Sequence, residues 1–188
     1  MIARIRMTFL AAAVVLVAAP AVHAQQQKMT EDDAILRNYV LTMPKVEAWA
    51  NATLEYTAAI KAKPLDERKK MEVEKDAQDA ETLTQTAAAL ERIPEVRRAF
   101  RKAGMTTKEA LTISLVLFQS VMYDQMSAQY PDAKIPYNMN PANLAFVRKN
   151  KAQLETRLKA VQEATKEASA EAKSDEPTDP DDPSPDEP

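Results

Sequence analysis

The residue types that perform most protein chemistry are nearly absent from this chain. It has no cysteine, and its only histidine, His23, lies in an apolar N-terminal segment that we expect to be removed. The mature chain would then lack histidine and cysteine nucleophile systems, zinc sites built on imidazole or thiolate, and cysteine ligation of haem or iron–sulfur clusters. The single glycine, Gly104, excludes nucleotide-binding glycine loops. We therefore predict no cofactor, no metal ion and no catalytic residues, although carboxylates, lysines, tyrosines and serines remain.

The first candidate site is a polar seam on an apolar helix. It consists of Gln119, Tyr123 and Asp124, with Thr112 one heptad before Gln119. If this seam faces the interior of a bundle, burial would raise the pKa of Asp124 and let it bind or protonate a ligand. The alternative is that the seam is the solvent-facing edge of the helix.

The second candidate site is the irregular segment 130–140, which reads YPDAKIPYNMN. Two prolines and two tyrosines in so short a stretch indicate an ordered loop, and ordered loops between packed helices often carry recognition groups. We predict a ligand-binding pocket formed by this loop and the helix after it. Its candidate residues are Tyr130, Tyr137, Asn140, Asn143 and Phe146, with Arg148 beside them.

Two further clusters allow a functional and a structural interpretation. Met122 and Met126 lie one helical turn apart, with Met139 near in sequence, and thioethers can hold copper(I); this spacing more often marks core packing. The basic residues Arg97, Arg98, Arg101 and Lys102 could bind phosphate. Because no glycine loop or aromatic residue accompanies them, we expect them to complement the C-terminal dipole of a short helix.

The element that positions the first candidate site is a helix over 106–129. Thr106 and Glu109 have the spacing of a reciprocal capping box, and Gly104 can close the preceding helix in a left-handed conformation. An apolar stripe with helical spacing is expected to face the core: Leu111, Leu115, Phe118, Met122 and Met126. More apolar residues flank this stripe, so the helix is predicted to be enclosed by others.

The remaining segments also favour helices. Thr30, Thr42, Pro94 and Asn140 have the types expected at helix starts, and Pro64 ends a helix. A heptad-like pattern over 73–90 predicts one continuous helix, and another helix is predicted over 140–163, fraying beyond it. We therefore predict an all-α fold, a single bundle of about five helices, spanning residues 25–173.

The two ends of the chain are distinct from this bundle. Residues 1–24 have the positive start, short apolar run and small-x-small ending of a cleaved secretory signal peptide. Residues 174–188 contain seven acidic residues, five prolines and no apolar side chain, which is typical of a disordered tail. No membrane span is expected in the mature chain.

These features predict an exported, non-enzymatic helical protein of the bacterial periplasm or cell exterior that binds a partner. Two alternatives stay open: a carrier of a small apolar or amphipathic ligand between helices, and a hydrolase that uses carboxylates alone. The body without its tail is nearly neutral, which argues against nucleic acid. The expected partner is a protein or a small apolar ligand, and the expected state is a monomer or a homodimer.

Overall fold

The computed structural model describes residues 29–64, 67–68 and 80–174, with side chains described as far as Ala168. The predicted signal peptide, the acidic tail and the first half of the predicted helix over 73–90 lie outside these ranges. All regular structure within them is helical, which confirms the all-α class.

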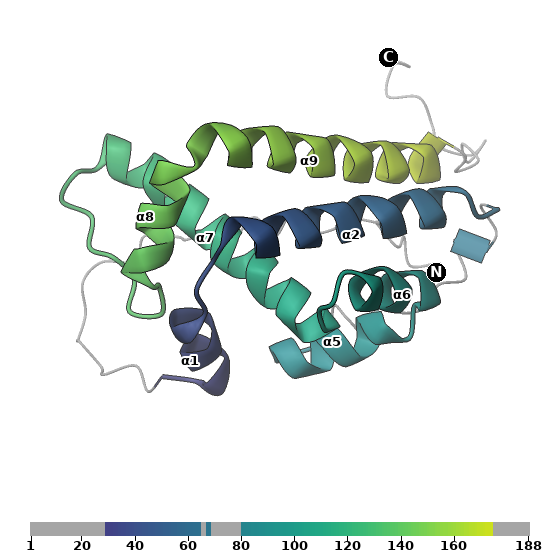
Figure 1. The fold of residues 1–188 in the computed structure, drawn as a ribbon, viewed down its shortest axis with the longest axis horizontal. Helices are drawn as coiled ribbons and strands as arrows, with labels where there is room; N and C mark the ends of the chain where they lie inside the picture. Colours follow the sequence, from purple (N-terminus) through teal and green to yellow (C-terminus); the bar gives the residue numbers. More distant parts are fainter. Residues whose placement is uncertain (1–28, 65–66, 69–79, 175–188) are drawn as a thin grey trace, which may run out of the picture.

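Seven helices make up the described part of the chain (Figure 1). They are α1 (Glu31–Asn38), α2 (Met43–Lys61), α5 (Leu83–Glu91), α6 (Pro94–Lys102), α7 (Thr107–Gln129), α8 (Pro141–Lys149) and α9 (Lys151–Ser174). The most extensive contacts join α2 to α6 and α9, and α7 to α5 and α8. In Figure 1 the long helices α2 and α9 lie side by side, and α7 runs obliquely to them.

The main core lies between α2, α6, α7 and α9. Tyr56 of α2 and Phe100 of α6 meet edge to face with ring centroids 5.6 Å apart, a geometry that stabilises by about 0.5–1.5 kcal/mol beyond the buried area. The most completely enclosed apolar side chains come from three different helices: Val46, Ala50, Ile113, Leu117 and Leu154.

Several predicted helix ends are confirmed by their local chemistry. Gly104 has φ +73°, and the bond from Met105 N–H to the Phe100 carbonyl (3.0 Å) closes α6 as a Schellman motif. Thr106 accepts a hydrogen bond from the Glu109 N–H at the start of α7. The reciprocal bond predicted from Glu109 is wrong, because its carboxylate bonds to Tyr39 instead.

Two predicted helices are shorter than expected. α5 begins only at Leu83, because Thr82 and Gln85 form a reciprocal capping box there, so the predicted continuous helix through Ala80 is wrong. The helix predicted over 140–163 is broken at Asn150, whose side-chain amide donates to the Phe146 carbonyl (2.8 Å) and thus competes with the helical ladder.

The helix after that break is longer than expected. α9 continues to Ser174, whereas the sequence pattern predicted fraying beyond 163. Glu167 near its end pairs with Lys61 at the end of α2 (3.3 Å), and this contact links the two long helices.

The expected core stripe of α7 is the main correction. Phe118, Met122 and Met126 are 51%, 48% and 42% exposed, and Leu111 and Leu115 are only partly buried. The opposite side of the helix faces the core instead, through Ala110, Ile113, Val116, Leu117, Ser120 and Tyr123. α7 is therefore packed on one side only and presents an apolar stripe to solvent.

Paired substitutions on α7 distinguish the two orientations. Leu117→Ala is expected to lower the free energy of unfolding by about 2–5 kcal/mol, because it leaves a cavity in the core. Met122→Ala is expected to lower it by about 1 kcal/mol or less, because half of that side chain is already exposed. Urea denaturation measures both values, and a larger loss for Met122→Ala would contradict the observed orientation.

Candidate functional site

The predicted loop-and-helix site is built around the segment that joins α1 to α2. Asn143 of α8 is fully buried, and its side-chain amide makes two hydrogen bonds to that segment. Its Nδ2 donates to the Tyr39 carbonyl (2.8 Å), and its Oδ1 accepts from the Leu41 N–H (2.9 Å). Asn140 caps α8 by accepting from the Ala142 N–H. The side chains of Asn143 and Asn140 therefore bond to backbone groups of this protein, and these bonds position the α1–α2 segment and the start of α8.

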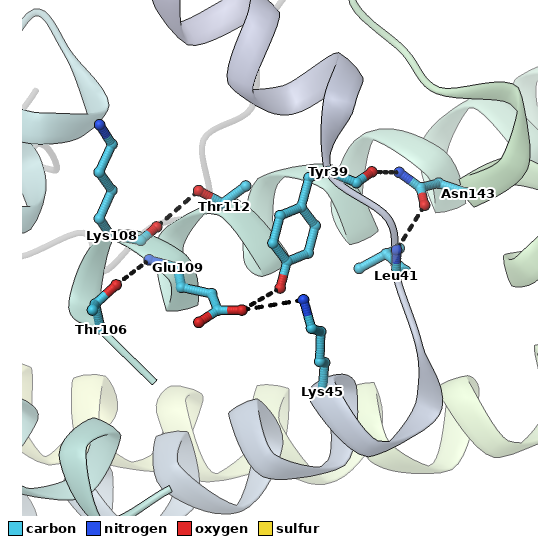
Figure 2. A network of polar contacts seen from close by, with 8 residues as sticks. All are labelled: Tyr39, Leu41, Lys45, Thr106, Lys108, Glu109, Thr112 and Asn143. Atoms are coloured by element: carbon cyan, nitrogen blue, oxygen red, sulfur yellow. Dashed lines mark hydrogen bonds and ion pairs between the residues drawn. The ribbon is translucent and has the colours of Figure 1, made fainter. Parts of the chain in front are cut away.

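A second set of contacts holds the same segment against α7, as Figure 2 shows. The Tyr39 hydroxyl donates to Glu109 Oε1 (2.9 Å), and Lys45 Nζ lies 3.3 Å from that oxygen. The Lys45 ammonium also lies 4.5 Å from the centre of the Tyr39 ring. Burial, together with the hydrogen bond and negative charge of Glu109, raises the pKa of Tyr39 well above its ordinary value. Tyr39 therefore stays a neutral hydrogen-bond donor.

Asp33 of α1 gathers polar groups from the predicted loop. Its carboxylate accepts from the Tyr137 hydroxyl (3.0 Å) and from Asn138 Nδ2 (2.9 Å), and Gln119 Nε2 of α7 donates to Asn138 Oδ1 (3.0 Å). Hydrogen bonds from the Thr30 side chain and backbone, and then from Asn138 and Tyr137, hold the pKa of Asp33 below its ordinary value. The hydrogen bond to Asp33 raises the pKa of Tyr137. The loop is thus tied to α1 as well as to α7.

The remaining predicted residues also make internal contacts. Tyr123 is buried and donates to the Ala133 carbonyl (2.6 Å), and Phe146 packs against the main core. Asp124 accepts from Arg148 Nε (2.7 Å) on α8. Tyr130 is 64% exposed. The structure therefore brings Gln119 and Tyr137 together around Asp33, and sets Tyr123 and Asp124 against different neighbours.

The two weaker candidate clusters lie on the surface. Met122 and Met126 are half exposed, so their interpretation as core packing is wrong, whereas Met139 is buried with Tyr123 and Leu144. The basic residues of α6 line a shallow open depression, and Lys102 among them pairs with Glu55 of α2 (3.0 Å).

The feature that sequence reasoning missed is the exposed stripe of α7. Between Thr107 and Gln129 the helix has three charged residues, and each is directed to a neighbouring element. Lys108 donates to Thr84, Glu109 pairs with Lys45, and Asp124 pairs with Arg148. The exposed side of α7 therefore has no charged side chain that is free of a contact to a neighbouring element. An apolar patch of this kind is typical of an interaction surface.

Comparisons with protein-family models, with curated protein sequences and with solved structures find no match. None of the helices in the described ranges is long and apolar enough to cross a membrane. In those same ranges no three or more aspartate, glutamate, histidine or cysteine side chains gather as a metal site would require.

Asn143→Ala tests the contact between α8 and the α1–α2 segment. It leaves the Leu41 N–H without its partner and the Tyr39 carbonyl with only the longer bond from Asn140 Nδ2 (3.4 Å), so the free energy of unfolding is expected to fall by about 1–3 kcal/mol. Asn51→Ala, on an exposed position of α2, is the matched control and should change it by no more than about 0.5 kcal/mol. Equal effects of the two substitutions in urea denaturation would contradict the positioning role of Asn143.

The lowered pKa of Asp33 predicts a pH dependence. Because the folded-state pKa lies below the ordinary 3.8, Asp33 stabilises the fold above pH 3.8, and this contribution is lost as the pH falls through the lowered value. The free energy of unfolding should therefore be larger for wild type than for Asp33→Asn near neutral pH. This difference should shrink as the pH falls below 3.8. Asp132→Asn, on an exposed loop position, serves as the control. A difference that does not change with pH would refute the prediction.

Proposed function

We propose that this chain is a non-enzymatic interaction protein that works after export, in the periplasm or at the cell exterior, and binds a protein partner through α7. The observation that carries the proposal is the stripe of α7, in which Phe118, Met122 and Met126 are exposed and Leu111 and Leu115 are partly buried. Exposure of large apolar side chains without charges between them costs solubility, so such a surface favours a partner that covers it.

The way the rest of the molecule is held supports this proposal. Of the polar residues predicted to bind a ligand, Gln119 and Tyr123 bond to the loop and Asp124 bonds to Arg148 of α8, and these contacts brace the helix that carries the stripe. Rigid presentation lowers the entropy lost on binding. Phe118 and Met122, which the carrier alternative would place beside an internal cavity, face solvent instead.

Export is supported by the sequence of residues 1–24, and the non-enzymatic assignment by the lack of histidine and cysteine after them. Both concern where and how the protein acts rather than which partner it binds. The stripe supports α7 as the site of binding, and its uncharged character favours an apolar partner surface.

Photocrosslinking in bacteria that express the full chain tests the proposal. A photoreactive residue at Met122 should give a protein adduct of discrete mass, because the partner covers that position. The same residue at Gln153, exposed on α9, should give none and is the matched control. The measured mass of the uncrosslinked protein should equal that of a chain that begins at Gln25. No adduct at Met122, or equal adducts at both positions, would count against a partner on α7.

A further inference from the structure

We propose that the partner of the α7 stripe is a second copy of this chain, with the two α7 helices packed antiparallel about a two-fold axis near Phe118. This inference rests on the proposed function and names the partner of the same surface. It is carried by the spacing of the stripe, by the charges around it and by its size.

Four residues of the stripe are placed symmetrically about a point just after Phe118. From Leu111 the apolar residues follow at intervals of four, three, four and four. If two copies pair antiparallel about a point just after Phe118, Leu111 of each lies opposite Met126 of the other, and Leu115 lies opposite Met122. The two Phe118 rings meet beside the axis. Four of the five apolar side chains therefore face an apolar side chain directly, and Phe118 lies between the partner's Phe118 and Gln119, which suits a self-complementary dimer interface.

The charges of α7 also fit this arrangement. The stripe holds no charge that would be repelled by its own copy, because Glu109 and Asp124 are directed to Lys45 and Arg148. Lys108 stands at one end of the helix and would lie close to the partner's Gln129 at the other end. The carbonyl end of a helix carries partial negative charge, and the last turn of α7 has no basic residue of its own. The Lys108 ammonium uses one donor on Thr84 of its own chain (2.9 Å) and has two more to complement this end.

The size of the stripe predicts a reversible dimer. A fully buried aromatic side chain contributes about 150–250 Å², so these five partly exposed side chains offer on the order of 300–400 Å² per copy. The loop 130–139, which exposes Tyr130 and Ile135, is held alongside α7 by Tyr123 and Gln119. Interfaces below about 1,200 Å² in total are weak and transient, and a dissociation constant of roughly micromolar order or weaker is expected.

Disulfide trapping tests the antiparallel geometry, because the natural chain has no cysteine. The double variant Leu111→Cys/Met126→Cys places two thiols 15 residues apart on one helix. They are separated by about 22 Å along the helix axis, so the two thiols of one chain cannot form a disulfide with each other. Oxidation of this variant is expected to give a covalent dimer with two disulfides. Leu111→Cys alone and Met126→Cys alone are the controls and should stay uncrosslinked. A covalent dimer from Leu111→Cys alone, or none from the double variant, would overturn the geometry.

Sedimentation equilibrium tests the partner itself. Wild type should pass from monomer to dimer as its concentration rises, and Phe118→Asp should weaken dimerisation by at least about 100-fold, because two carboxylates would face each other without water. Gln153→Asp adds the same charge on α9 and should leave dimerisation unchanged. A wild type that remains monomeric overturns the inference. If the Met122 adduct is then a different protein, the proposed function still stands, whereas absence of any adduct removes both.

Discussion

The arrangement of α1 and α2 depends on the side-chain amide of the buried Asn143, which makes two hydrogen bonds to the segment that joins them. α1 has no fully buried side chain, and Leu36 is its one partly buried residue that packs against the main core, so polar contacts carry much of its attachment. In the extended segment after α1, the Leu41 N–H donates to the Asn143 side chain, and the Tyr39 carbonyl accepts from Asn143 (2.8 Å) and, at longer distance, from Asn140 (3.4 Å). An unsatisfied buried backbone group costs about 1–3 kcal/mol, so this segment has one favourable position. From there Asp33 reaches the loop that follows α7.

The same polar contacts determine which side of α7 faces solvent. Glu109 and Asp124 point toward α2 and α8, where Lys45 and Arg148 neutralise them, and Gln119 points toward the loop. With its charged side chains used in this way, the outward side of α7 retains only uncharged residues. The surface proposed for binding is therefore a consequence of how α1, α8 and the loop are anchored.

The candidate site could be predicted only in part. The sequence located the polar residues of α7, the loop and α8, but the partners of Tyr137 and Asn143 come from α1 and the segment after it, about 100 residues away along the chain. The orientation of α7 was mistaken because Thr112 and Ser120 resemble surface residues in the sequence. Their hydroxyls donate to the carbonyls of Lys108 and Val116 in their own helix, so both can be buried at little cost.

The sequence by itself determined the all-α class and most helix ends, because these depend on neighbouring residues. Gly104 closes α6 and Thr106 starts α7 through bonds within a few positions, and the capping box of Thr82 and Gln85 that begins α5 is equally local. Only the tertiary structure decided which apolar side of α7 is buried. Both sides have helical spacing, and the choice depends on how residues distant in sequence satisfy the polar groups between them.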